Sequence, residues 1–203
     1  ALIDTLNHGD TRLIALSALR TLVAANSDLL EKQGPHLSSL LLNFLQPGKT
    51  QFLKLETLQT LIALCRIDAV VSMTFTTFNW LFECFQCDSE IVEVAVAART
   101  LHLATILAKR GHASAILMRM SSKAMTLATL GDFSGDALQS LTNYCAVVLH
   151  NNRRLAAKMY TKLSVMPVDS EKLFQSDAGI QAIRVRGWCL AALCGRVPVS
   201  SIQ

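Results

Sequence analysis

The sequence predicts an all-α fold in which helical repeats stack side by side and wind into a right-handed superhelix. One observation is a phrase of five residues, with leucine in the second place, that returns about every forty residues. Another is that, between successive helix-breaking residues, the apolar residues recur at helical spacing. A period near forty with this patterning is typical of solenoid proteins. The copies begin at Ala18, Thr57, Thr100, Ala137 and Cys189, and their leucines are 39, 43, 37 and 52 residues apart.

The composition of the chain agrees with a packed helical protein. Of its 203 residues, 51% are hydrophobic and 17% are charged, which is the opposite of the balance found in disordered chains. Leucine and alanine, which favour helices, are abundant, whereas aromatic residues make up 6%. We therefore expect residues 1–203 to form a single α-solenoid fragment of a longer protein, about four to five repeats long. A weak break is expected, if anywhere, at 164–178.

Three helices are expected before residue 50. Asp10 suits the cap of a helix over 11–25, because its side chain can accept a hydrogen bond from the first turn. A short helix over 27–32 would end at the glycine that follows it. Pro35 then suits the first turn of a helix that includes 37–45, where no backbone donor is needed.

Three more helices are expected between residues 50 and 111. Thr50 can cap a helix that runs to about residue 66. The segment 70–85 is rich in Phe, Thr and Val, which suits strands, but its helical flanks and the lack of a hairpin turn favour a helix. Acidic residues open the helix over 88–110, basic residues close it, and Gly111 ends it, as the helix dipole and the C-cap favour.

The remaining chain predicts four helices, separated by glycine, asparagine or proline. The most polar connection, 168–177, precedes the last of them and accounts for the longer spacing of the final repeat. The four helices are expected at 113–130, 134–150, 153–163 and 179–194.

The segments Ala15–Asn26 and Ala137–Cys145 resemble the third helix of armadillo repeats. The resemblance covers most of the chain in period and pattern, and HEAT repeats match it equally well. It implies an extended surface that holds a partner. In peptide-binding armadillo proteins, an Asn just before the last Leu of this phrase clamps the backbone of an extended ligand. We do not expect that mode here, because the matching positions are Thr21, Thr60, Ser140 and Ala192, and Asn143 matches only after a shift of three residues.

Catalytic and metal-binding patterns are sparse. Cys84 and Cys87 have the spacing of metal ligands, but no second Cys or His pair follows at a suitable spacing, so we predict neither a metal site nor a cofactor. His8 has a carboxylate at helical spacing, Asp4, which indicates a surface contact, and His102 is expected to be a packing residue. The pattern contains no cluster of nucleophile, base and oxyanion donor, so no enzymatic activity is expected.

The cysteines and the longest uncharged stretches indicate where in the cell the protein is expected. The longest stretches without a charged residue, 33–48 and 137–152, are sixteen residues long, which is short of a bilayer span. We expect most cysteines to be buried thiols, as in an intracellular protein of the cytoplasm or nucleus. They are residues 65, 84, 87, 145, 189 and 194.

The aromatic residues allow two interpretations. Phe78, Phe82 and Phe85 fall at i, i+4 and i+7, which is the spacing of a stripe that faces the core. Trp80 and Trp188 complete the set. We expect these residues to lie in the core, and the alternative is that they anchor a partner helix in a groove.

The charges are unevenly distributed along the chain. Residues 1–100 hold 7 basic and 10 acidic residues, whereas 101–203 hold 12 basic and 5 acidic ones, so the C-terminal half is expected to contact an acidic partner. The strongest candidates lie on one helix, where Arg154, Lys158 and Lys162 follow at steps of four and share a face. The full set of candidate partner-binding residues is Arg153, Arg154, Lys158, Lys162, Arg119, Lys123, Lys109 and Arg110.

The sequence therefore predicts a non-enzymatic scaffold that binds an acidic or amphipathic segment of a protein on a concave or basic surface. One alternative is a module of a nuclear complex that contacts nucleic acid, although a net charge of +4 is modest for that role. Another is a purely structural spacer within a larger solenoid. No membrane partner is expected.

Overall fold

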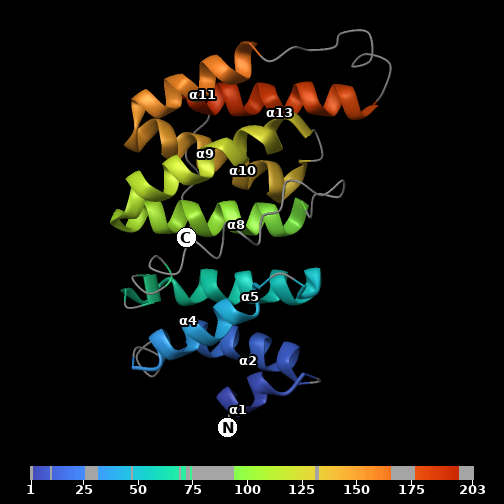
Figure 1. The fold of residues 1–203 in the computed structure, drawn as a ribbon, viewed down its shortest axis with the longest axis vertical. Coiled ribbons are helices and arrows are strands. Elements are labelled where there is room, and N and C mark those ends of the chain that lie inside the picture. Colours follow the sequence, from blue (N-terminus) through green and yellow to red (C-terminus); the bar gives the residue numbers. More distant parts are fainter. Residues whose placement is uncertain are drawn as a thin grey trace. The chain divides into compact units, whose positions relative to one another are not determined.

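The computed structural model shows a chain made of helices joined by turns (Figure 1). No strand occurs in the part of the chain that it describes, so the predicted all-α class is confirmed there. The chain divides into two compact units, Ala1–Leu107 and Ala108–Gln203. The structure describes residues 2–9, 11–25, 32–46, 48–68, 70–71, 74, 94–130, 133–165 and 177–196.

The first unit holds five described helices. In it, α2 packs against α1 and α5, and α5 also packs against α4 and α8. The helices α2, α4, α5 and α8 occur where helices were predicted, whereas α1 was not predicted, and the predicted caps are confirmed in part. Their bounds are α1 Leu2–Asn7, α2 Arg12–Ala25, α4 Gly34–Asn43, α5 Gln51–Leu64 and α8 Val94–Leu107.

Local sequence signals explain where two of these helices begin. The Thr50 hydroxyl accepts a hydrogen bond from the backbone N–H of Leu53 at 3.4 Å, as expected of a residue that caps α5. Pro35 lies in the first turn of α4, where the missing N–H leaves no hydrogen bond unmade. The sequence therefore placed both helix starts within a few residues.

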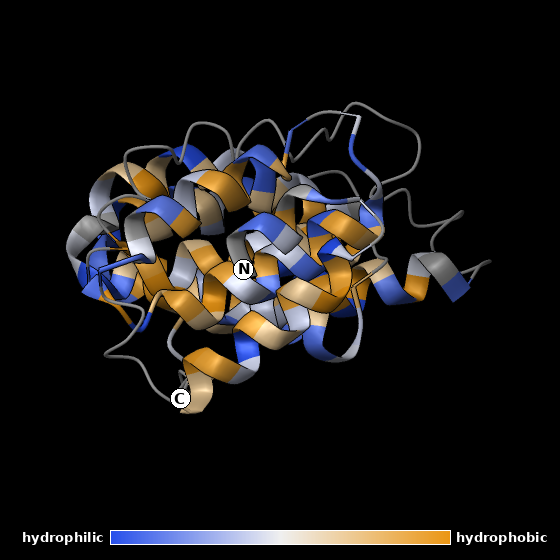
Figure 2. Ribbon diagram, turned by 90° about the horizontal axis from the view of Figure 1, so that it is seen from below, coloured by the Kyte–Doolittle hydropathy of each residue, from blue (hydrophilic) through white to orange (hydrophobic). Residues whose placement is uncertain are grey.

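The recurring leucines form the core of the first unit. Leu19 on α2, Leu58 and Leu61 on α5 and Leu101 on α8 are fully buried. The helices carry both apolar and hydrophilic residues, as the colouring in Figure 2 shows. Burial of these leucines supplies the hydrophobic stabilisation that explains the repeated phrase. The last leucine of the first copy, Leu22, is nevertheless 48% exposed.

The second unit is built around α13. This helix packs against α9, α10 and α11, while α10 and α11 also pack against each other. A short π-helical turn, η1, precedes α9, and Gly111 within it adopts φ 107°, a left-handed conformation that favours glycine. The predicted helix end at Gly111 is therefore confirmed. The bounds are η1 Ala108–His112, α9 Ala113–Leu130, α10 Gly135–Asn151, α11 Arg153–Val165 and α13 Asp177–Leu193.

Buried polar contacts fix the helices of this unit relative to one another. The hydroxyl of Tyr144 on α10 donates a hydrogen bond to the Leu117 carbonyl on α9 at 2.7 Å. The Gln181 side-chain amide on α13 donates to the Phe133 carbonyl at 3.0 Å. Because each contact joins segments far apart in the sequence, together they set how α9, α10 and α13 pack.

Several expectations lie outside the described residues. These are the cap at Asp10, the short helix over 27–32, the beginning of the helix predicted at 88, and most of the connection 168–177. Of the predicted helix over 70–85, the described residues Val70, Val71 and Thr74 are helical. The side chains of Phe78, Trp80, Phe82, Cys84, Phe85 and Cys87 are also outside the described part.

Candidate interaction surface

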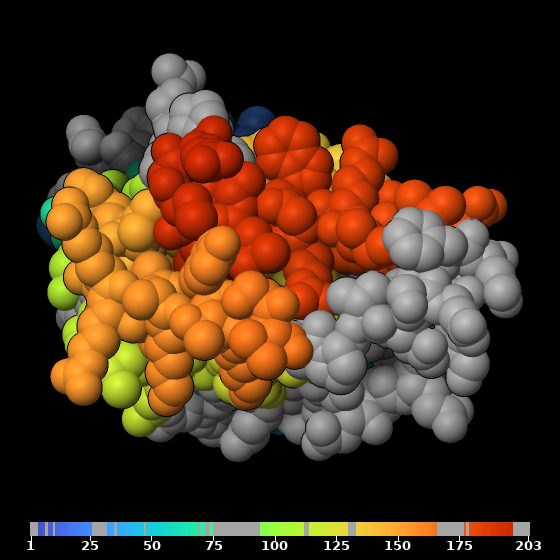
Figure 3. All heavy atoms as spheres, turned by 90° about the horizontal axis from the view of Figure 1, so that it is seen from above, coloured from blue at the N-terminus to red at the C-terminus, as the bar shows by residue number. Residues whose placement is uncertain are grey.

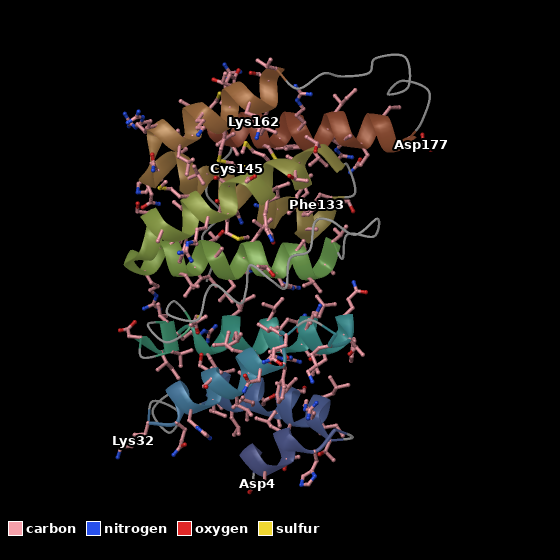
Figure 4. All side chains as sticks on the ribbon, in the orientation of Figure 1. Asp4, Lys32, Phe133, Cys145, Lys162 and Asp177 are labelled. Carbon is pink, nitrogen blue, oxygen red and sulfur yellow. The ribbon has the colours of Figure 1, made fainter. Side chains whose placement is uncertain are left out.

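Three of the four predicted cations on α11, Arg154, Lys158 and Lys162, lie along one side of that helix, and Arg153 lies beside them at its first residue. Arg153, Arg154, Lys158 and Lys162 are all exposed, and Figure 4 labels Lys162 near the end of the helix. On the opposite side of α11, Ala156, Met159 and Leu163 are buried. The arrangement follows from the helical period, since residues four apart lie on one face and the apolar residues between them lie on the other. The exposure of the predicted basic stripe on α11 is therefore seen, and its role in binding stays a prediction.

No ion pair or hydrogen bond from these four side chains is seen within the described ranges. The helix contains no acidic residue, and neither of its end turns carries one. Lys162 in the last turn is favourably placed near the negative end of the helix dipole. The other three cations have no such stabilisation among the described residues.

The other four predicted cations come from two further elements. Lys109 and Arg110 belong to η1, and Arg119 and Lys123 lie four residues apart on α9. Three of them are exposed, whereas Lys123 is half-buried. The eight candidates thus lie on three elements of one compact unit, and the strongest concentration is the stripe on α11.

The structure adds an apolar surface that the sequence pattern did not identify. Ile180, Ile183 and Trp188 on α13 are 54%, 38% and 46% exposed. The expectation that the aromatic set lies in the core is wrong for Trp188. The reason is that α13 is apolar around most of its circumference, and its neighbours α9, α10 and α11 cover only one side.

The helices α11 and α13 lie side by side at the surface of the second unit, as Figure 3 shows and their contacts confirm. The basic stripe and the apolar side of α13 therefore belong to neighbouring helices. Only one acidic residue, Asp177, occurs on either helix, at the first position of α13. Such a combination of exposed apolar and uncompensated basic residues suits binding to a molecule that is apolar in part and acidic in part.

Three of the four described thiols are buried. Cys65, Cys145 and Cys189 are buried, as expected, whereas Cys194 is exposed because it follows the last turn of α13. A hydrogen bond with the Cys189 thiol, together with burial, raises the pKa of Cys145 well above its ordinary value. A nucleophilic or metal-binding cysteine needs the opposite shift, since the thiolate is the reactive form.

The described part of the chain contains neither a cluster of metal ligands nor a membrane-spanning helix. It contains no group of three or more His, Cys, Asp or Glu side chains placed to hold a metal ion. Within the same ranges, every helix is too short or too polar to cross a bilayer.

The positions that match the peptide clamp of armadillo proteins differ in exposure. Thr60 and Ala192 are fully buried, and Asn143 is almost completely buried. Thr60 donates a hydrogen bond to the Glu56 carbonyl of its own helix at 2.8 Å. Thr21 is exposed and Ser140 is half-buried, so the burial that keeps an extended ligand away applies to Thr60, Ala192 and Asn143 only.

Comparison of the chain with protein-family models, with curated proteins and with solved structures finds no match.

Proposed function

We propose that this chain is a non-enzymatic scaffold, an α-solenoid of the armadillo or HEAT kind, that binds a segment of another protein inside the cell. The observation that carries the proposal is the exposed basic stripe of α11, formed by Arg153, Arg154, Lys158 and Lys162. In support, the helix carries no acidic residue that would neutralise these charges. The recurring buried leucines support the solenoid part of the proposal. Binding would proceed without chemical turnover.

Charge and apolar contact would contribute differently to such binding. Exposed cations at the edge of an interface mainly accelerate association and exclude partners of the wrong charge. Affinity comes chiefly from apolar groups that become fully desolvated near the centre of an interface. A partner segment that carries both acidic and apolar residues would therefore bind more tightly than one that carries acidic residues alone.

The test is a double charge reversal, Arg154→Glu with Lys158→Glu. Both side chains are exposed and lie opposite the buried side of α11, so helicity measured by circular dichroism should not change. Recovery of protein partners from nuclease-treated lysate should fall at least about tenfold, as expected for loss and inversion of two interface charges. The matched control reverses two exposed cations of the first unit, Lys49→Glu with Arg66→Glu, and should retain the partners. Equal recovery by both variants would exclude the α11 stripe.

Contact with nucleic acid is the second candidate, favoured by the same row of uncompensated cations. Its signature differs, because phosphate contacts release counterions and give a steep dependence of affinity on salt. Partners lost upon nuclease treatment would place nucleic acid first. If no specific partner is recovered under any condition, the result would instead favour a structural spacer.

A further inference from the structure

The exposed side of α13 is largely apolar, with one cation, Arg184, among its apolar residues. Taken at 3.6 residues per turn, Ile180, Ile183, Gly187, Trp188 and Ala191 fall on one side of the helix and make up its apolar stripe. The residues on the other side, Val185, Cys189 and Ala192, are completely buried. The stripe spans about 16 Å along the helix axis, from the rise of about 1.5 Å per residue. This length corresponds to three turns of a helix that could pack against it.

At the middle of the stripe is a glycine that the chain itself does not require. A Cβ atom added to Gly187 would meet no atom within 4 Å. Gly34 on α4 differs, because a Cβ atom there would lie 2.7 Å from a methyl group of Val70. A glycine inside a helix lowers helix stability relative to alanine, so it is usually explained by close packing. Packing within the described chain explains Gly34 and does not explain Gly187.

A second helix that crosses at Gly187 would account for it. Interaxial distances of packed helices are about 8–10 Å, and small residues at the crossing point permit the shorter ones. Ile183 and Trp188 lie on either side of the glycine and would contact apolar residues of the crossing helix. The face thus has a flat centre and two large apolar flanks, which suits an α-helix.

The charges around the stripe indicate the chemistry of its occupant. Arg184 is exposed on the stripe itself, one turn from Ile180 and one from Trp188, and Arg196 is exposed just beyond the end of α13. The four exposed cations of α11 lie on the neighbouring helix. The single acidic residue on the two helices, Asp177, is at one end. Most of the exposed side chains of the face are apolar and offer nothing to a phosphate backbone, so the arrangement favours a protein helix that carries acidic residues over nucleic acid.

We propose that the exposed face of α13 is the docking site for an amphipathic α-helix of a partner protein. Its apolar residues pack across Gly187, and its acidic residues face Arg184 and the basic stripe of α11. This inference rests on the proposed scaffold function and specifies the partner and the contact residues. It places the energetic centre of binding on α13 and gives the α11 cations the role of orienting the partner.

The test selects helical peptides against the 203-residue chain. The probe is a displayed library of helix-forming peptides with apolar residues at i, i+3, i+4 and i+7, in which the flanking positions vary among Glu, Gln and Lys. We expect enrichment of Glu at the flanks. The enriched peptide is then synthesised, together with a twin in which each Glu is replaced by Lys, and binding is measured by fluorescence anisotropy. The twin should bind at least tenfold more weakly.

The decisive variant is Gly187→Gln, which fills the centre of the stripe without changing its charge. Because glutamine is a better helix former than glycine and meets open space, the melting temperature should stay the same or rise. Peptide affinity should fall at least tenfold. The matched control, Ala18→Gln, adds the same side chain at an exposed position of α2 and should bind the peptide normally.

Four results would overturn the inference. The first is a selection that enriches Lys or Gln at the flanks or that yields no binder. The second is equal affinity of the parent chain and Gly187→Gln for the peptide. The third is displacement of the peptide by a 20-nucleotide DNA strand, and the fourth is a dimer of the chain, seen by sedimentation, that Gly187→Gln abolishes. A different result would exclude the proposed function, so the two proposals can be tested apart. Binding that survives Gly187→Gln but is lost in the Arg154→Glu, Lys158→Glu variant removes the α13 site and keeps the scaffold. Binding that is indifferent to both variants removes both.

Discussion

Tyr144 shows how one buried side chain links two helices. Its hydroxyl donates to the Leu117 carbonyl at 2.7 Å, and its side chain is completely buried. Burial raises the pKa of Tyr144 well above its usual value, and the neighbouring Cys145 adds to the shift. The neutral hydroxyl is therefore the form that the folded chain stabilises, and both the contact and the ionisation can be tested.

Replacing Tyr144 with phenylalanine should lower the free energy of unfolding at pH 7 by about 1 kcal/mol, the usual effect of losing one hydrogen bond. The ring still fills its space between α9 and α10, so the effect should not reach that of a cavity, about 3 kcal/mol or more for loss of an aromatic side chain. Urea unfolding monitored by circular dichroism measures the difference. A loss near zero would mean that the hydroxyl contact adds nothing.

The same residue predicts how stability depends on pH. Below pH about 10, the ordinary tyrosine pKa, Tyr144 is protonated in both the folded and the unfolded chain, and its contribution is fully present. Above that pH the unfolded chain loses the proton first, since the folded pKa is raised, so the free energy of unfolding falls as pH rises. Unfolding curves at pH 7, 9 and 10.5 should show a smaller decline for Tyr144→Phe than for the parent chain. Identical declines would contradict the assignment.

At the scale of helices, a charged contact joins α2 to α5. A guanidinium nitrogen of Arg20 lies 2.6 Å from a carboxylate oxygen of Glu56, and the same nitrogen reaches the Glu56 carbonyl at 3.3 Å and the Thr60 hydroxyl at 3.4 Å. The two charged side chains are 25% and 18% exposed, which places the pair between a surface and a buried ion pair. One arginine thus bonds three acceptors on the facing helix.

Arg20→Ala should therefore destabilise the chain by about 1–2 kcal/mol, more than a surface ion pair and less than a buried one. Arg20→Lys should retain only part of the stability that Arg20→Ala loses, because an ammonium group does not match the planar guanidinium geometry. Arg66→Ala is the control, since that side chain is exposed and its loss should change stability by less than about 0.5 kcal/mol. Thermal unfolding measures all three variants, and equal shifts for Arg20→Ala and Arg66→Ala would refute the role of the contact.

Helices and their ends were largely predictable from the sequence, because glycine and capping residues act locally. The helix predicted at 113–130 has those bounds in the structure, and α13 begins only two residues before its predicted start. Which face of a helix is buried was less predictable. The stripe on α11 followed from its clear alternation of apolar and basic residues, whereas α13 has apolar residues on both sides, and only its packing partners decide that Trp188 is exposed.

At the scale of the whole chain, charge is concentrated in one unit. Ala108–Gln203 contains the 12 basic and 5 acidic residues of the C-terminal half, whereas the first unit has more acidic than basic residues. An acidic partner should therefore bind the second unit. Association should be faster at low ionic strength, because screening shortens the reach of these charges.

The salt dependence of affinity separates the two classes of partner. If the four cations of α11 contact phosphates, the counterion slope predicts a loss of about fiftyfold or more in affinity between 50 and 200 mM salt. An acidic helix held mainly by the apolar face of α13 should lose less than about tenfold, since apolar burial is insensitive to this range of salt. Titration of the selected peptide and of a DNA strand across the same salt series gives both slopes. A peptide slope as steep as that of DNA would mean that charge alone holds the complex, and the apolar stripe would then have no part in binding.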